Sequence, residues 1–104
     1  MHHRLVTRYA TKSAASADEN QRRIEGVFSA LEEAKPSNVS YLVLRLDDDS
    51  FLHISFHNHD DSEVNPIGST AAFAYFQREH SERRSGDVDQ HRATLVGAYI
   101  TTIA

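Results

Sequence analysis

The stretch FLHISFHNHD, residues 51–60, holds three of the seven histidines of the chain. Histidine is the commonest metal ligand and the one side chain whose charge changes near neutral pH. Hydrophobic and polar residues alternate over residues 51–58, which predicts a strand. Alternate side chains of a strand share a face, so His53 and His57 point the same way with their Cα atoms about 13 Å apart. That separation is too large for both to bind one metal ion.

His57 and His59 are closer, about 7 Å apart along the same face, which two imidazoles can span. A catalytic zinc ion needs three protein ligands, however. The one nearby carboxylate expected on the same face, Asp61, lies beyond the expected end of the strand, and the chain has no cysteine. We therefore predict no metal and no cofactor here, and interpret the histidines as lining a cavity and its rim. Further ligands would have to come from a second copy of the chain.

Four strands and two helices are predicted, in the order β-α-β-β-α-β. The strands are residues 4–11, 39–46, 51–58 and 92–103, where β-branched and aromatic residues gather. The first helix begins at a capping box formed by Ser16 and Glu19 and ends at Lys35–Pro36. Gly68 or Ser69 caps the second helix, and residues 81–90 are expected to form a polar turn.

This order predicts an α+β class protein with a ferredoxin-like β-α-β-β-α-β fold. It comprises a four-stranded antiparallel sheet with both helices on one face. Residues 1–104 are expected to form a single domain of this kind, because the chain has the length of one ordinary domain.

The two central strands each carry one wholly hydrophobic set of alternate positions, which we expect to lie under the helices. The set comprises Leu42, Leu44, Leu46, Leu52, Ile54 and Phe56. For these residues to share a face, the turn must hold an odd number of residues, most simply Asp47–Asp49. Asp49 would then adopt a left-handed conformation, which Asp tolerates. In this register Ser55 lies opposite Tyr41, and His53 lies opposite Val43.

The opposite face is expected to carry no helix, although Tyr41, Val43 and Phe51 lie on it. An apolar sheet face needs a cover, and a second copy is the simplest one, giving a homodimer whose sheets enclose a cavity. The predicted catalytic residues are His53 and His57, since histidine can take a proton from a phenol-like substrate.

The predicted substrate-binding residues are Tyr41, Arg45, Phe51 and Ser55, with Arg45 stabilising the resulting anion. The alternative is that these polar groups only satisfy one another within the dimer interface.

The charge composition of the chain indicates which classes of partner are expected. The net charge is −4 and the sequence pI is about 5.9, whereas nucleic-acid-binding proteins usually carry a basic surface. The RNA recognition motif has the same order of elements, but here His53 replaces an aromatic residue that would stack on a base, and Asp49 replaces a basic one. We therefore expect neither a nucleic acid nor a membrane as partner. The absence of cysteine fits a cytoplasmic location.

Several stretches resemble the dimeric α/β-barrel superfamily, and within it small proteins near the antibiotic biosynthesis monooxygenase group. They are YATK, ADENQRRIEGVFSALEEAKP, YLVLRL, FLHI, NPI, AFAYFQ and LVGAY, which together cover almost the whole chain. The resemblance implies a dimeric α/β barrel that binds a small molecule, with cofactor-independent oxygenation of an aromatic or quinol-like substrate as the activity. A non-catalytic dimeric structural or interaction module is the alternative, and the sequence leaves open whether the chain is an enzyme.

Overall fold

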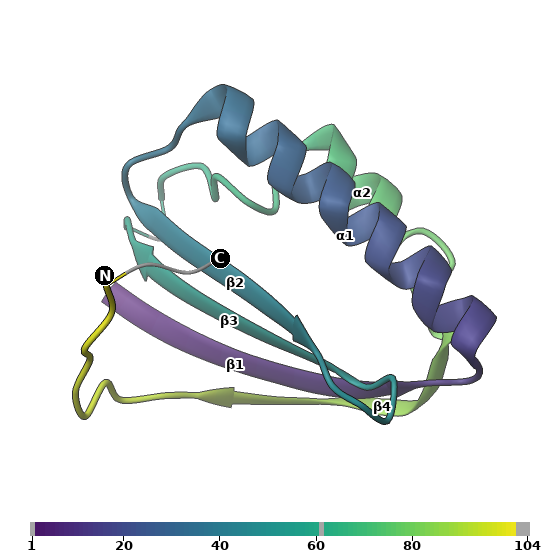
Figure 1. Cartoon of the computed structure of the whole chain (residues 1–104). Coiled ribbons are helices and arrows are strands. Elements are labelled where there is room, and N and C mark those ends of the chain that lie inside the picture. The colour runs from purple at the N-terminus through teal and green to yellow at the C-terminus, as the bar shows by residue number, and fades with distance from the viewer. Residues whose placement is uncertain (1, 61, 102–104) are drawn as a thin grey trace.

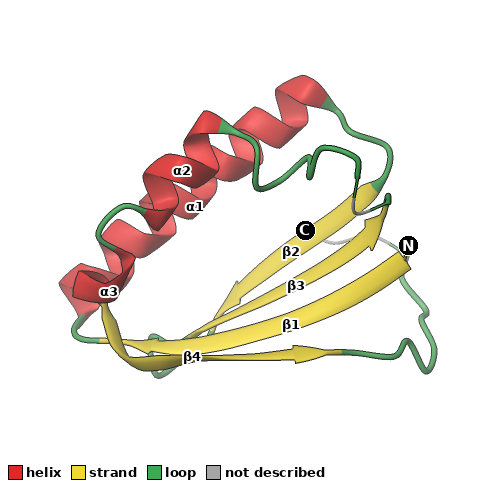
Figure 2. Cartoon of the chain, turned by 180° about the vertical axis from the view of Figure 1, so that it is seen from behind, coloured by secondary structure: helices red, strands yellow, loops and turns green. Residues whose placement is uncertain are grey.

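The computed structural model describes residues 2–60 and 62–101. Its elements are β1 (His2–Thr11), α1 (Ala14–Ala34), β2 (Val39–Arg45), β3 (Phe51–Asn58), α2 (Ala71–Gln77), α3 (His80–Arg83) and β4 (Arg84–Arg92). The strands form one antiparallel sheet in the order β2-β3-β1-β4, and the helices lie along one of its faces (Figures 1 and 2). The predicted α+β ferredoxin-like architecture is confirmed, with the short helix α3 as an unpredicted addition.

Each of the two predicted helices begins at a capping side chain close to, but different from, the predicted one. The hydroxyl of Ser13 accepts a hydrogen bond from the backbone N–H of Ser16, so α1 starts three residues before the predicted capping box. Thr70 caps α2 in the same way, in place of Gly68 or Ser69. The predicted end of α1 is confirmed: Lys35 is left-handed (φ 50°) and Pro36 follows it.

The last strand was predicted in the wrong place. It spans Arg84–Arg92, which the sequence indicated as a polar turn, whereas residues 93–101 form no strand. β4 leaves α3 directly and pairs with β1 from Thr11↔Arg84 to Leu5↔Arg92, interrupted by a bulge between Arg8 and Ala10. Pairing with the available edge of β1 outweighs the β-branched preference of the later segment.

The hairpin between β2 and β3 has the predicted register. Tyr41 lies opposite Ser55 and Val43 opposite His53. The backbone N–H of Leu46 donates to the carbonyl of Ser50 at 2.8 Å, which closes a turn of Asp47–Asp49. Asp49 is left-handed, with φ of 65°.

The assignment of the two sheet faces was inverted. The polar and aromatic set lies under the helices, where Tyr9 and Phe51 pack with Ile24 and Val27 of α1. The hydrophobic set of Leu42, Leu44, Leu46, Leu52, Ile54 and Phe56 therefore lies on the face without a helix, and Leu44 is 45% exposed. Burial of the polar set is tolerated because its members hydrogen-bond to one another.

None of the helices in the described ranges is long and apolar enough to cross a membrane.

Candidate functional site

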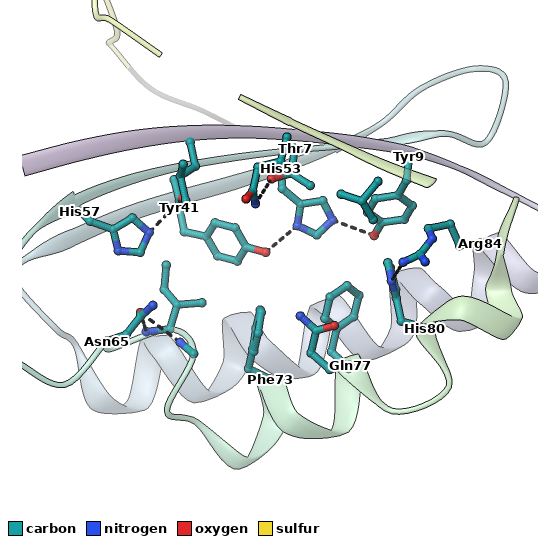
Figure 3. A pocket seen from close by; sticks show the side chains of 17 residues that line it. Thr7, Tyr9, Tyr41, His53, His57, Asn65, Phe73, Gln77, His80 and Arg84 are labelled. Atoms are coloured by element: carbon teal, nitrogen blue, oxygen red, sulfur yellow. Dashed lines mark hydrogen bonds between the residues drawn. The ribbon is translucent and has the colours of Figure 1, made fainter. Parts of the chain in front are cut away.

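A cavity of about 270 Å³ lies within one chain, between the sheet and the helices (Figure 3). The sheet supplies Leu5, Thr7, Tyr9, Tyr41, His53, Ser55, His57, Arg84, Val88 and Gln90. The other wall, formed by the helices and the loop before α2, comes from Asn65, Ile67, Gly68, Phe73, Phe76, Gln77 and His80. A cavity was predicted between the sheets of two copies, but it lies inside the single chain. The reason is that the polar face of the sheet is turned toward the helices.

The structure brings together four of the six predicted site residues: Tyr41, His53, Ser55 and His57 all line the cavity. Phe51 and Arg45 do not. Phe51 is 1% exposed and belongs to the hydrophobic core.

The guanidinium of Arg45 lies outside the cavity. It donates to Asp49 at 2.7 Å and, through its other terminal nitrogen, to Asp18 at 2.9 Å. These two carboxylates hold Arg45 between the hairpin turn and the N-terminal part of α1.

His53 is the centre of the site, because each of its ring nitrogens contacts a tyrosine hydroxyl. Nε2 lies 2.8 Å from the hydroxyl oxygen of Tyr9, and Nδ1 lies 2.6 Å from that of Tyr41. Figure 3 shows the imidazole between the two phenol rings, across the cavity from Phe73. His53 therefore reaches a ligand only through a tyrosine.

Tyr41, His53 and Tyr9 form a hydrogen-bonded row, and this row continues beyond Tyr9 to residues of α1 and α3. The amide nitrogen of Asn20 donates to the Tyr9 hydroxyl at 2.8 Å, and Nε of Arg83 donates to Oδ1 of Asn20 at 3.0 Å. Asn20 is fully buried, and Arg83 also donates to the backbone carbonyls of Phe76 and Arg78. Its charge is thus solvated by oxygen atoms of the protein.

Burial shifts the pKa of Tyr9, His53 and Tyr41 in the direction that favours the uncharged form of each side chain. It lowers the pKa of His53 to about 4, with a smaller effect from His80. It raises the pKa of Tyr9 to about 12 and that of Tyr41 further still. At neutral pH the two tyrosine hydroxyls and the imidazole of His53 are therefore uncharged.

A second histidine group closes one end of the cavity. Nε2 of His57 lies 3.0 Å from Oγ of Ser55, and Nδ1 lies 3.0 Å from Nε2 of His59. The ring of His3 stacks on that of His57 at 4.6 Å between centroids. Burial, followed by the neighbouring imidazoles of His3 and His59, lowers the pKa of His57.

His80 and Arg84 form the opposite end. Arg84 donates to Nδ1 of His80 at 2.9 Å, and the His80 ring stands edge-on to Tyr9 with centroids 4.6 Å apart. Burial lowers the pKa of His80 to about 4, and the charges of Arg83 and Arg84 add to this effect. Among the described lining residues Arg84 is the one cation, and none is Asp or Glu.

Sequence reasoning missed Tyr9, Asn20, His80 and Arg83. Asn20 carried a readable signal, since it lies four residues before Ile24 and seven before Val27, on the buried stripe of α1. A polar side chain on such a stripe must find a buried partner. Nothing in the local sequence indicates that the partner is Tyr9.

Nothing in the described ranges arranges three His, Asp or Glu side chains so that they could hold a metal ion. The His3, His57 and His59 rings lie together, but His57 and His59 are hydrogen-bonded to each other.

Solved structures share this fold. A Caulobacter crescentus protein with the provisional name antibiotic biosynthesis monooxygenase superimposes with a TM-score of 0.72 at 13% identity, covering 92% of this chain and 91% of its own. A Nitrosomonas europaea protein with the same provisional name gives 0.69 at 9% identity, covering 91% and 90%. SnoaB from Streptomyces nogalater, a cofactor-independent oxygenase solved as a point mutant, gives 0.64 at 14% identity, covering 93% and 95%.

No protein-family model and no curated protein matches the sequence. At these identities the likeness establishes the fold, and the expected resemblance to the ferredoxin-like antibiotic biosynthesis monooxygenase structures is confirmed at that level.

Proposed function

We propose that the protein binds an aromatic phenol or hydroquinone in the cavity and oxidises it with dioxygen, without a cofactor. The observation that carries the proposal is the hydrogen-bonded row of Tyr9, His53 and Tyr41, which lines one wall of an aromatic-lined cavity. Cavities that are mainly apolar with a few convergent polar groups are the usual sites of small-molecule binding. The shared fold of a cofactor-independent oxygenase supports the same chemistry.

The reaction needs no external reductant. An ionised phenol is electron-rich and can give an electron to dioxygen, after which the two radicals combine at a ring carbon. One oxygen atom stays on that carbon, and the other leaves as water with the hydrogen of that carbon and the phenolic proton. The product is a quinone, and the phenol supplies all the electrons that reduce dioxygen.

In this proposal the ring of the substrate packs between the sheet and the aromatic side chains of Phe73 and Phe76. Tyr41 contacts the phenolic oxygen, and His53 acts through Tyr41 because both of its nitrogens are engaged. Ser55 and His57, at the far end, contact a second polar group of the substrate.

The test is oxygen uptake with a panel of naphthols and hydroquinones, followed with an oxygen electrode and by quinone absorbance. We expect quinone and consumed dioxygen in equal amounts, and a loss of at least tenfold in kcat/KM in Tyr41→Phe. Tyr75→Phe is the matched control, since Tyr75 is 46% exposed on α2 and does not line the cavity. Saturable binding without oxygen uptake would contradict the oxygenase activity, and absence of binding throughout the panel would contradict the binding function as well.

A homodimer is the assembly that the uncovered sheet face supports. Leu42, Leu44, Leu52 and Ile54 form a contiguous apolar surface there, because Leu42 lies opposite Ile54 and Leu44 opposite Leu52. A second copy can cover its own equivalent surface by two-fold symmetry. This dimer leaves each cavity within its own chain, and it forms equally well if the protein has no catalytic activity.

A further inference from the structure

The hydrogen-bond row across the cavity has a direction, and Arg83 imposes it. A guanidinium can only donate, so Nε of Arg83 must find an oxygen at Asn20. The Asn20 amide is thereby oriented with its nitrogen toward Tyr9, to whose hydroxyl oxygen it donates at 2.8 Å. The opposite orientation would set the amide NH₂ against the guanidinium, with no oxygen between them.

The next link follows from the hydroxyl of Tyr9. Its oxygen accepts from Asn20, and its other partner is Nε2 of His53, so its hydrogen goes to that nitrogen. A neutral imidazole carries one hydrogen. With Nε2 accepting, that hydrogen lies on Nδ1 and is donated to the Tyr41 oxygen at 2.6 Å.

The reverse direction would leave a hydrogen-bond donor unused in the core. If His53 donated from Nε2, the hydroxyl hydrogen of Tyr9 would have no acceptor among the described residues, and Tyr9 is 4% exposed. Leaving such a group unpaired costs roughly 1–3 kcal/mol. The direction from Arg83 to Tyr41 satisfies the donors of Asn20, Tyr9 and His53 in turn, and the one hydroxyl hydrogen left over is that of Tyr41, which lines the cavity.

Tyr41 is the end of the row. Its oxygen accepts from His53, and within the described part of the chain no acceptor lies within hydrogen-bonding distance for its own hydrogen. Tyr41 lines the cavity and is more exposed than Tyr9, and its ring stacks on that of Phe28 of α1 with centroids 5.1 Å apart. The free hydrogen is thus available to a bound molecule.

We propose that the Arg83, Asn20, Tyr9 and His53 row makes Tyr41 a hydrogen-bond donor to the ligand, so that the cavity selects phenols in their ionised, phenolate form. This inference rests on the proposed function, since it requires a phenol in the cavity. Tyr41 is then the specificity-determining contact, and the other four are positioning residues. A donor aimed at an oxygen that carries negative charge stabilises the anion over the neutral form.

The charges around the cavity favour the same form. Arg84 stands on its wall and Arg83 lies behind Tyr9, whereas no described lining residue carries a carboxylate. His80, whose ring stands against Tyr9, and His53 within the row remain neutral at pH 7 because burial lowers the pKa of each to about 4. A phenolate in the cavity therefore meets donors and a cation without an opposing negative charge.

The probe for the test is 4-nitrophenol, whose anion absorbs visible light and whose neutral form does not. The wild-type protein should lower the pKa of bound 4-nitrophenol by about one unit, a tenfold preference for the anion. Tyr41→Phe should remove most of this shift, and Tyr75→Phe should leave it unchanged. Nitrobenzene, which cannot ionise, should bind to the wild type and to Tyr41→Phe with affinities that agree within about threefold.

The Asn20→Asp substitution should reverse the donor-to-acceptor direction of the hydrogen bonds in the row. The carboxylate keeps the bond from Arg83 but accepts the Tyr9 hydrogen, so Nε2 of His53 donates to Tyr9, and the Tyr41 hydroxyl donates to Nδ1. Tyr41 then offers the ligand an acceptor, and the pKa of bound 4-nitrophenol should rise above its value in solution. The ¹⁵N spectrum of His53 should change from the Nδ1–H tautomer in the wild type to the Nε2–H tautomer in Asn20→Asp.

The new negative charge itself also disfavours an anion, so two controls separate the effects. Asn58→Asp adds the same charge at the exposed end of β3 and should change neither the tautomer nor the pKa. In the Tyr41→Phe background, Asn20→Asp should retain only the effect of its charge, and the difference between the two backgrounds is the part transmitted through Tyr41.

The outcomes are distinct. An Nε2–H tautomer of His53 in the wild type, or bound 4-nitrophenol with an unshifted or raised pKa, would overturn this inference and leave the proposed function standing. Failure of both 4-nitrophenol and nitrobenzene to bind would overturn the proposed function and this inference with it. The wild-type tautomer and the Tyr41→Phe titration decide the matter even if Asn20→Asp does not fold.

Discussion

Nδ1 of His57 lies 3.0 Å from Nε2 of His59, so these two imidazoles bind each other with the nitrogens that a shared metal ion would need. The remaining nitrogen of His57 is engaged by Ser55 at 3.0 Å. His3 supplies a third imidazole, but its ring lies nearly parallel to that of His57, with an angle of 13°. Stacked rings present their faces to each other, and their nitrogen lone pairs do not converge on one point.

We therefore predict that the protein, purified without an affinity tag, contains no stoichiometric metal. Elemental analysis should find well under one zinc or nickel ion per chain, and a chelator should leave the melting temperature unchanged. The control is the same protein incubated with excess zinc and then dialysed. A melting temperature several degrees lower after chelation would show that these histidines rearrange around a metal.

Acid should destabilise the fold. The folded pKa of His53 is about 4, below its unfolded value near 6.5, and the pKa values of His57 and His80 are lowered too. The unfolded state then binds more protons, so the stability present above about pH 6.5 is lost as the pH falls toward 4. For His53 alone the loss between pH 7.5 and 5 is about 2 kcal/mol.

Urea unfolding at pH 7.5 and pH 5 measures this loss. His53→Gln should reduce the difference between the two pH values, whereas His91→Gln, at an exposed position on β4, should reproduce the wild-type difference. Equal stability of the wild-type protein at both pH values would count against neutral, buried histidines.

A charge on the uncovered sheet face should separate the proposed dimer. Leu44 is 45% exposed there, and Leu52 lies opposite it on β3. Leu44→Asp places a carboxylate on the apolar surface, where burial against a second copy would remove its water of hydration. Sedimentation at micromolar concentration should show a dimer for the wild type and a monomer for Leu44→Asp.

Val64→Asp is the matched control, because Val64 is 72% exposed in a loop away from that face. This variant should remain a dimer. A wild-type chain that sediments as a monomer would remove the dimer proposal, while the cavity within each chain would be unaffected.

Alternation along the strands could be read from the sequence, but the side of the sheet that the helices cover could not. The hairpin register followed from requiring Leu44 and Leu52 to share a face, and that reasoning holds whichever face is covered. A hydrophobic set of alternate strand residues does not by itself indicate which face of the sheet packs against the helices. Here the buried polar side chains form hydrogen bonds with one another, centred on His53 and its two tyrosines. The aliphatic side chains lie on the face of the sheet that no helix covers.

The sequence could predict those contacts of the site that are local in the chain, and not those between distant segments. Tyr41, His53 and Ser55 lie on one hairpin, so their proximity follows from local register. The contacts of His53 with Tyr9, and of Tyr9 with Asn20, join segments 44 and 11 residues apart. These depend on how β1 and α1 pack together, which no local pattern specifies.

Arg45 should be dispensable for the ligand. Its guanidinium binds Asp49 and Asp18 outside the cavity, so Arg45→Gln removes surface ion pairs and no contact with a bound molecule. We expect the affinity for 4-nitrophenol to be unchanged, with at most a small decrease in melting temperature. Tyr41→Phe in the same titration provides the comparison, and a similar loss of anion preference in Arg45→Gln would show that the guanidinium reaches the cavity.

Phe51 should matter for stability and not for ligand contact. Its side chain is 1% exposed and stacks on Tyr9 with ring centroids 5.8 Å apart, and it does not line the cavity. Phe51→Ala removes a whole buried ring, and such changes cost about 3–5 kcal/mol through lost burial and the void left behind. Urea unfolding should show a destabilisation of this size, against a difference within about 1 kcal/mol for Tyr75→Ala at an exposed position.

Ligand titration then separates the two roles. The titration is done without urea, at a pH and temperature where Phe51→Ala remains folded. Its affinity for nitrobenzene should agree with that of the wild type within about threefold, because the aromatic rings that line the cavity are still present. Near-wild-type stability combined with a large loss of affinity would instead place Phe51 in the binding site, as its position in the sequence first indicated.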